Sequence, residues 1–195
     1  LVPRPETELL VEEVVAASRM IKPDGPLSIL DLGAGSGNIS ISLAKLIPES
    51  KITAVDVSAD ALEVVKGNAH LNEVTGQIEC VQVDMREFLS QNVKNKFHLI
   101  VSNPPYIPSA EISKLPREVQ NEPRLALDGG KDGVDFYRAI LQAAPRFLKE
   151  NGQLLMEIGE DQRTSLEKIC SEAQGFARIE FKKDYSDRDR IVIIS

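Results

Sequence analysis

Four consecutive residues, Asn103, Pro104, Pro105 and Tyr106, combine groups that could hold a planar amide or arylamine for reaction. The side-chain carbonyl of Asn103 can accept one N–H of such a group, and the backbone carbonyl of Pro104 can accept the other. Pro105 fixes the geometry because its ring restricts φ, and the Tyr106 ring can flank the planar group. A planar NH₂ is a poor nucleophile, and two acceptors would stabilise positive charge as its nitrogen becomes tetrahedral. The pattern therefore favours methyl transfer from a sulfonium over hydride transfer.

A glycine-rich loop, DLGAGSG at residues 31–37, follows an apolar run and precedes a helical pattern. Gly33, Gly35 and Gly37 would let the backbone turn tightly and approach a ligand closely, because glycine has no Cβ. The spacing G-x-G-x-G differs from the G-x-G-x-x-G of dinucleotide-binding folds, and a glycine loop alone does not identify its ligand. The alternative is a tight turn between strand and helix, although three alternating glycines would be unusual for that purpose alone.

Two carboxylates end the next two apolar runs. Asp56 could accept both ribose hydroxyls of an adenosine-bearing ligand. Asp84 could bind the adenine amine, while Met85 covers the ring. Either acid taken alone is more often a helix cap or a solvated turn residue. Together with the glycine loop, however, the two acids predict an adenosine site across one edge of a sheet.

Short apolar runs alternate with helical patterns along the chain. The expected strands are 27–33, 51–58, 78–84, 97–103 and 152–159, with an antiparallel pair at 176–184 and 190–195. The expected helices are 6–21, 37–48, 58–72, 134–152 (with a kink at Pro145 and a stop at Gly152) and 161–173. This alternation predicts an α/β fold with a mainly parallel sheet, helices on both faces and a ligand site beyond the carboxyl ends of the strands. The longest stretch without a regular pattern is 104–133, and such loops are usually functional or disordered.

The composition narrows the class of protein. The 195 residues fit one domain, and the formal net charge of −7 argues against a large phosphate-neutralising surface, so nucleic acid is an unlikely partner. The sequence shows no apolar run near the roughly 20 residues of a membrane span, and no signal peptide. We expect Cys80 and Cys170 to be reduced thiols of a cytoplasmic protein, His70 to be a surface residue and His98 to lie in the core or at an edge. No His, Cys and carboxylate spacing indicates a metal site.

Five segments carry a resemblance to a known family, the HemK/PrmC methyltransferases. They are PRPETE (3–8), NPPYIP (103–108), EPRLALDGGKDGVDFYR (122–138), LLMEIGEDQ (154–162) and DYSDRDRIV (184–192). The resemblance spans essentially the whole chain, and its most specific segments are the first and the third. It implies a class I S-adenosylmethionine-dependent methyltransferase with a mainly parallel seven-stranded sheet and a C-terminal antiparallel hairpin. It further implies methylation of the glutamine side-chain amide (N5) in the Gly-Gly-Gln motif of class-1 peptide-chain release factors, which would be the protein partner.

The resemblance also implies roles for individual residues. The cofactor S-adenosylmethionine, and its product S-adenosylhomocysteine, would contact Gly33, Ala34, Gly35, Ser36, Gly37, Asp56, Val57, Asp84, Met85 and Asn103. The glutamine amide would be held by Asn103 to Tyr106, bordered by Arg4 and Thr7 and covered by a flap containing Glu122 and Pro123. In the family a small helical domain that helps to hold the release factor precedes PRPETE. We therefore expect residues 1–195 to be the catalytic domain of a longer protein.

Three other functions share parts of this pattern. The same methyl transfer could act on a glutamine of a ribosomal protein. The corner formed by residues 103–106 does not show which of the two proteins is the substrate. A DNA adenine methyltransferase would use the same Asn-Pro-Pro-Tyr corner on a flipped base, but it should carry a recognition domain and a basic surface. A non-catalytic subunit that binds the cofactor and activates a partner would have no physical need for that corner.

Overall fold

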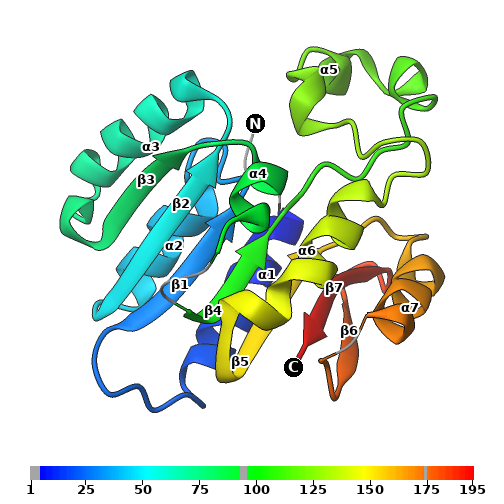
Figure 1. Ribbon diagram of the computed structural model, residues 1–195. Coiled ribbons are helices and arrows are strands. Elements are labelled where there is room, and N and C mark those ends of the chain that lie inside the picture. The colour runs from blue at the N-terminus through cyan, green and yellow to red at the C-terminus, as the bar shows by residue number, and fades with distance from the viewer. Residues whose placement is uncertain (1–4, 93–95, 174) are drawn as a thin grey trace.

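The computed structural model of the protein describes residues 5–92, 96–173 and 175–195, except the side chain of Pro5. Its centre is one seven-stranded sheet with the strand order β3-β2-β1-β4-β5-β7-β6 (Figure 1). The strands are β1 Leu27–Leu32, β2 Ser50–Asp56, β3 Ile78–Gln82, β4 Phe97–Ser102, β5 Leu148–Glu157, β6 Ile179–Lys183 and β7 Asp189–Ile194. The first five strands pair in parallel, and β7 runs antiparallel to both β5 and β6. The predicted fold class and the C-terminal hairpin are confirmed.

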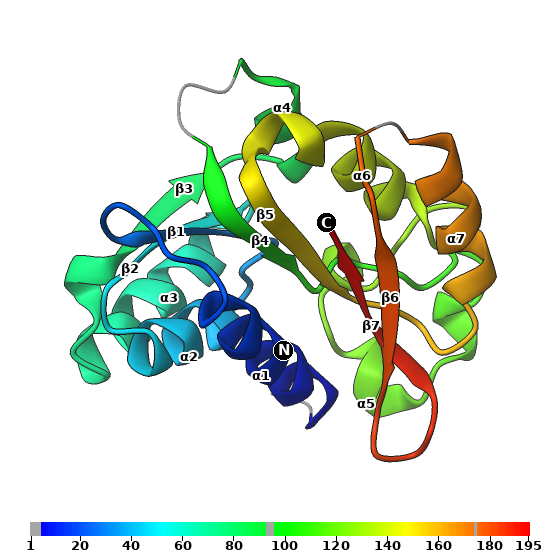
Figure 2. The ribbon, with the colours of Figure 1, turned by 90° about the horizontal axis from the view of Figure 1, so that it is seen from below.

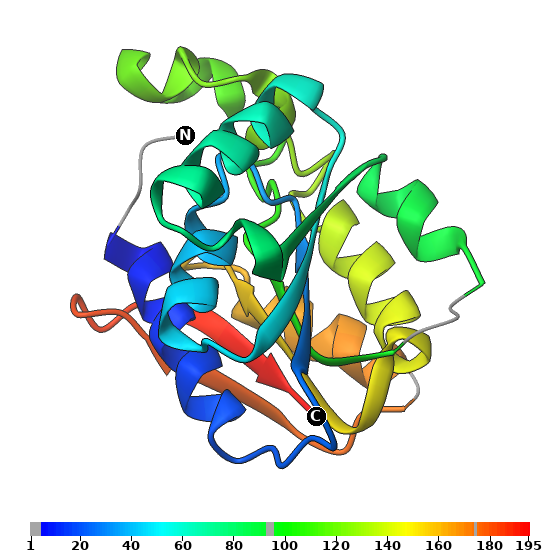
Figure 3. The same ribbon diagram turned by 90° about the vertical axis from the view of Figure 1, so that its left-hand side faces the viewer.

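Helices cover both faces of the sheet. They are α1 Pro5–Ser18, α2 Asn38–Leu46, α3 Ala59–Leu71, α4 Met85–Ser90, α5 Arg117–Gln120, α6 Asp135–Phe147 and α7 Arg163–Glu172, with short 3₁₀ turns at Thr75–Gln77, Ile112–Lys114 and Arg124–Ala126. Seen edge-on, α1, α2 and α3 lie on one side of the sheet, and α4, α6 and α7 lie on the other (Figures 2 and 3). In the described residues, no helix is long and apolar enough to cross a membrane.

The period of two along each strand divides the core between these layers. In β1, Leu30 and Leu32 pack with α4 and α6, whereas Ile29 packs with α1 and α2 on the opposite face. In β4, Ile100 belongs to the first cluster, and Leu99 belongs to the second. Both faces of the central strands are therefore buried, which explains why their sequences read as continuous apolar runs.

The structure corrects one helix boundary in particular. The predicted helix 134–152 ends at Phe147, and β5 begins at once with Leu148, which pairs with Phe97. The pairing register then shifts, and Asn151 adopts a positive φ of 60° within the bulge. The predicted stop at Gly152 is therefore wrong, because Gly152 lies in the strand. Pro145 is accommodated inside α6 near its end.

Two other features differ from the sequence prediction. Helix α4 begins shortly after β3, with Val83 and Asp84 between them, and it was not expected, because six residues give too short a pattern to recognise. The segment 104–133 contains α5 and two 3₁₀ turns, and it lies over the carboxyl edge of the sheet (Figure 1). The strand order reverses between β1 and β4 at this edge, which is where open α/β sheets bind ligands.

Candidate active site

Asn103 follows β4 directly, at the point where the strand order reverses. Its Nδ2 donates hydrogen bonds to Glu157 Oε2 at 2.8 Å and to Thr7 Oγ1 at 3.3 Å. Within the described parts of the chain, no donor contacts its Oδ1. The N–H groups are engaged by the protein, so the side-chain carbonyl is the atom left to accept a ligand's N–H.

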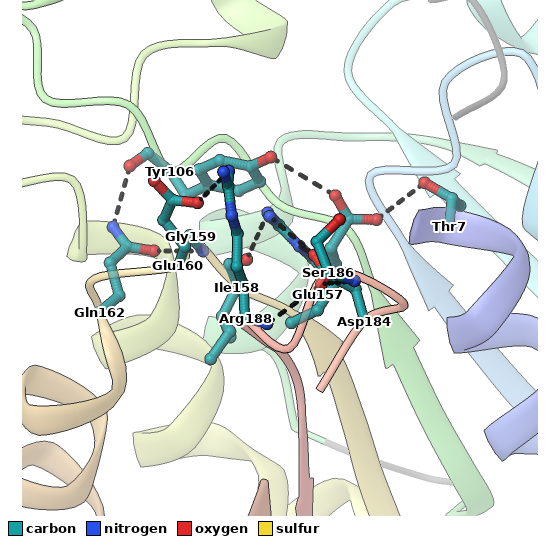
Figure 4. Close-up of polar contacts among 11 residues, drawn as sticks. Thr7, Tyr106, Glu157, Ile158, Gly159, Glu160, Gln162, Asp184, Ser186 and Arg188 are labelled. Carbon is teal, nitrogen blue, oxygen red and sulfur yellow. Dashed lines mark hydrogen bonds and ion pairs between the residues drawn. The ribbon is translucent and has the colours of Figure 1, made fainter. Parts of the chain in front are cut away.

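Glu157 is the polar centre of this corner and was missed by the sequence analysis as a site residue. It ends β5, is only 1% exposed, and accepts hydrogen bonds from Thr7 Oγ1 at 2.7 Å and from the Tyr106 hydroxyl at 3.4 Å (Figure 4). A signal existed in the sequence, because a carboxylate that ends an apolar run is the same feature that identified Asp56 and Asp84.

The backbone of Tyr106 is held by a second group of contacts. Gln162 Nε2 donates to the Tyr106 carbonyl at 2.9 Å and to the Gly133 carbonyl at 3.0 Å. A Cβ on Gly129 would lie 2.7 Å from Tyr106 Cα, and a Cβ on Gly133 would lie 2.5 Å from Tyr106 O. Gly129 and Gly133 of LDGGKDG are therefore needed because two backbone segments touch at this point.

Asp128 helps to connect segment 127–130 to residues 107–109, which follow the Asn-Pro-Pro-Tyr corner. Its carboxylate accepts from Ser109 Oγ, from the Gly130 N–H at 3.1 Å and from Arg124 Nε at 3.1 Å. The hydrogen bond from Ser109, followed by that from Gly130, lowers the pKa of the Asp128 carboxyl below its usual value. The Ile107 N–H also donates to the Leu127 carbonyl at 2.9 Å, so residues 107–109 and 127–130 are held as one unit.

Two hollows meet at Asn103. The corner hollow is lined by Thr7, Ala34, Asn38, Pro104, Tyr106, Glu157 and neighbouring residues. The loop hollow is lined by Asp56, Val57, Asp84, Met85, Pro105, Phe136 and neighbouring residues. Gly33, Gly35, Ser36, Asn103 and Ala126 line both hollows. A ligand in the loop hollow and a ligand in the corner hollow would therefore lie on either side of the Asn103 side chain.

The glycine loop has the conformation that its sequence predicts. Gly33, Gly35 and Gly37 have φ values of 76°, 55° and 83°, all in the left-handed region that favours glycine. The Gly35 N–H donates to Asp56 Oδ2 at 2.7 Å, and the Ser58 N–H donates to Asp56 Oδ1 at 2.9 Å. Gly37 lines neither hollow; a Cβ there would lie 3.0 Å from Val65, so this glycine allows α2 and α3 to approach each other.

Asp84, between β3 and α4, has two structural roles. Asp84 Oδ1 accepts from the Arg86 N–H at 2.8 Å and so caps α4, which is the simpler alternative considered for this residue. Asp84 nevertheless lines the loop hollow with Met85. Arg86 lies over the Phe136 ring at 4.7 Å and forms one wall of the hollow. The loop hollow thus combines apolar side chains with two carboxylates, and this combination suits a ligand that has both a flat ring system and hydroxyl groups.

Asp31, at the end of β1, is a buried acid that the sequence analysis did not single out. Its Oδ2 accepts from Ser40 Oγ at 2.5 Å, while its Oδ1 is buried and lacks a partner among the described residues. Burial raises the pKa of the Asp31 carboxyl from 3.8 to about 6, and the hydrogen bond from Ser40 opposes this shift.

The remaining predicted residues are distributed as follows. Arg4 lies outside the described residues, and Thr7 lies in the corner hollow. Pro123 lines the loop hollow rather than the corner. Glu122 lies in a separate depression with Ser109, Arg124 and Leu127, so the structure does not bring it to the corner.

The histidines lie away from the site. His98 is 8% exposed, and its Nδ1 accepts from the Ser28 N–H at 2.9 Å at the opposite edge of the sheet. His70 is exposed on α3. The positions expected for both are confirmed. Cys80 and Cys170 are free and partly buried. Among the described residues, no group of three or more His, Cys, Asp or Glu side chains is arranged to hold a metal ion.

Comparison with known proteins gives matches along the whole chain. The profile of the methyltransferase small domain family matches residues 6–118. A release factor glutamine methyltransferase from Chlorobaculum tepidum is 43% identical over 195 residues, covering 97% of this chain and 65% of that protein. A second, from Thermodesulfovibrio yellowstonii, is 40% identical and covers 100% of this chain and 68% of that protein. The chain thus spans about two thirds of the length of these curated relatives.

A solved structure supports the fold. A ribosomal protein L11 methylase from Lactobacillus delbrueckii subsp. bulgaricus superposes with a TM-score of 0.66 at 22% identity. The alignment covers 99% of this chain and 79% of that one. At this identity the likeness concerns the arrangement of helices and strands alone.

Proposed function

Since the chain belongs to the methyltransferase small domain family and, within it, to the release factor glutamine methyltransferases, we propose that it methylates a glutamine side-chain amide. The donor would be S-adenosylmethionine. The acceptor would be the glutamine of the Gly-Gly-Gln motif in class-1 peptide-chain release factors. We also propose that residues 1–195 form the catalytic domain for this reaction.

The loop hollow fits the cofactor. Gly33 and Gly35 turn the backbone tightly beside it, and Asp56 and Asp84 supply carboxylates for the ribose and the adenine amine. When bound, S-adenosylmethionine supplies a methyl group on a positively charged sulfonium. Because Asn103 lines both hollows, the acceptor nitrogen can meet this methyl group beside its side chain.

The orientation of Asn103 is the observation that carries the proposal. Its Nδ2 is engaged by Glu157 and Thr7, which leaves the Oδ1 carbonyl to accept one N–H of the substrate amide. The Pro104 carbonyl accepts the other, and the Tyr106 ring flanks the amide plane. Two carbonyl acceptors hold the nitrogen in line for attack and stabilise the positive charge that develops on it.

The proposal is tested by methyl transfer from labelled S-adenosylmethionine to three purified acceptors in parallel. They are a class-1 release factor, a ribosomal protein with an exposed glutamine and adenine-containing DNA. Label in the release factor alone is the expected result, with Asn103→Ala as the inactive control. Label in the ribosomal protein or the DNA, but not in the release factor, would replace the proposed substrate while keeping the chemistry.

A further inference from the structure

An asparagine side chain has nearly the same shape when its oxygen and nitrogen exchange places. Its hydrogen-bond partners alone decide which atom faces a ligand. The question matters at Asn103, because with its nitrogen outward the corner would present a donor and could hold a carboxylate. With its oxygen outward it presents acceptors and holds an NH₂ group.

Glu157 settles this choice. An ionised carboxylate can only accept hydrogen bonds, so the Asn103 atom 2.8 Å from Oε2 must be the nitrogen. The hydroxyl of Thr7 is itself committed, since it donates to the same Oε2 at 2.7 Å. Towards Asn103, at 3.3 Å, Thr7 therefore presents a lone pair. Without Glu157 the Thr7 hydroxyl could donate or accept, and both orientations of Asn103 would become possible.

The surroundings keep Glu157 fixed in this role. Its side chain points into the corner beside Thr7 and the Tyr106 hydroxyl (Figure 4), and the residue is 1% exposed. Its backbone carbonyl accepts from the hydroxyl of the fully buried Tyr137 at 2.9 Å. The donors that converge on the carboxylate are the arrangement that a buried anion requires.

We propose that Glu157 is a positioning residue that fixes the Asn103 carbonyl outward, and that it thereby makes the corner select a glutamine amide and reject a glutamate carboxylate. The inference rests on the proposed function and extends it to substrate selection. A glutamate in the same place would direct its oxygens at the Asn103 and Pro104 carbonyls. Such acceptor–acceptor contacts leave buried polar groups unpaired, and this is how polar sites discriminate strongly.

The test compares Glu157→Ala and Glu157→Gln with the wild type. Met156→Leu, in the same strand and fully buried but away from the corner, controls for packing changes. The first readout is the Asn103 side-chain NH₂ signal in a ¹⁵N-correlated NMR spectrum, assigned by its loss in Asn103→Asp. It requires neither cofactor nor release factor. The second readout is the single-turnover methylation rate at saturating cofactor and release factor, together with KM for the release factor.

We expect the NH₂ protons to exchange slowly with water in the wild type and in Met156→Leu, and fast in Glu157→Ala. The single-turnover rate of Glu157→Ala should fall by about 100-fold, with KM for the release factor changed by less than about three-fold. The reason is that the variant loses only the orientation of the Asn103 side chain and of the substrate amide that it holds. In Glu157→Gln the side-chain oxygen can still accept from Asn103, so both readouts should recover in part.

An unchanged NH₂ signal in folded Glu157→Ala, or in Glu157→Leu, which likewise lacks an acceptor, if the alanine variant does not fold, would overturn the positioning role. A single-turnover rate of Glu157→Ala within about three-fold of the wild-type rate would also overturn it, because a misoriented substrate amide should react far more slowly. If the wild-type protein does not methylate the release factor, the proposed function is refuted. The NMR comparison would still decide whether Glu157 orients Asn103.

Discussion

The glycine-loop edge and the Asn-Pro-Pro-Tyr corner lie side by side but are held together in different ways. At the loop edge, the supporting hydrogen bonds span short stretches of the chain: Asp56 accepts from the N–H of Ser58, two positions away, and from that of Gly35, 21 positions away. At the corner, Glu157 bonds Thr7 across 150 positions and Asn103 across 54. The first region therefore depends on one strand–helix–strand unit, β1-α2-β2 with the turn after it, and the second depends on segments that only the complete fold brings together.

This difference predicts distinct kinds of damage. Changes at the loop edge should weaken cofactor binding while leaving the reaction of the bound complex nearly intact. Changes at the corner should slow the reaction while cofactor binding persists. The substitutions of Asn103 and Asp56 described below test this separation.

The largest effect is expected from Asn103→Ala, which removes the only side-chain acceptor proposed for the substrate amide. We expect kcat to fall by about 100- to 1000-fold, the range for loss of one stabilising group at a reacting centre. Cofactor affinity should change much less. Single-turnover kinetics and calorimetry measure the two quantities separately. A cofactor Kd that weakens as much as kcat falls would show that the corner belongs to the cofactor site.

Gly133→Ala should disturb the corner through its close backbone approach to Tyr106. The new Cβ would lie 2.5 Å from the Tyr106 carbonyl oxygen, and Gly133 has a φ of 77° that other residues rarely adopt. We expect a loss of stability of about 1–3 kcal/mol and a rate lower by up to about 100-fold, because Tyr106 must move. Urea unfolding and steady-state kinetics measure these effects.

Gly76→Ala is the matched control, since a Cβ there meets nothing within 4 Å. It should leave both quantities unchanged. If Gly133→Ala and Gly76→Ala have the same stability and the same rate, the close approach to Tyr106 is not the reason why residue 133 is a glycine.

Asp56→Ala should act mainly on cofactor binding. It removes the carboxylate proposed for the ribose, and charge-assisted hydrogen bonds contribute about 1.5–3 kcal/mol, so Kd should rise by about 10- to 100-fold. At saturating cofactor, kcat should stay within about five-fold of the wild type, because the corner remains intact. Asp24→Ala, at the opposite edge of the sheet, should leave Kd unchanged. Unaltered affinity in a folded Asp56→Ala protein would contradict the assignment of the ribose site.

The smallest effect concerns Asp31 and pH. Burial raises its pKa in the folded protein to about 6, above the ordinary value of 3.8, so the folded state holds this proton more tightly than the unfolded state. Its contribution to stability is therefore complete at pH values below 3.8 and is lost as pH rises through about 6. Between pH 5 and pH 7.5 this loss is about 1 kcal/mol.

Asp31→Asn cannot titrate and should lack this part of the pH dependence. Urea unfolding gives the free energy of unfolding of both proteins at pH 5 and pH 7.5. The change between the two pH values is then compared between the wild type and Asp31→Asn. An identical pH dependence in the two proteins would show that the Asp31 carboxyl does not have a raised pKa.

The contrast between the two regions also explains what the sequence predicted. The parallel strands, the helix after the glycine loop and the acids at strand ends follow from local patterns, and the structure places them as expected. Glu157 has the same strand-end signal as Asp56 and Asp84, but nothing local shows that β5 lies beside β4 or that Thr7 of α1 reaches the same point, so its role was overlooked. The early end of α6 was missed for a related reason, since the pairing of Leu148 with Phe97 overrides the helical pattern.

The position of the transferred methyl group tests the proposed function most directly. Tandem mass spectrometry of a class-1 release factor, after incubation with the protein and S-adenosylmethionine, locates it within the Gly-Gly-Gln segment. A release factor with glutamate in place of that glutamine serves as the control. We predict one methyl group on the side-chain amide nitrogen of the glutamine and none on the glutamate variant. A methyl group on another residue, or none on the glutamine, would contradict the proposal that this corner holds a glutamine amide for transfer.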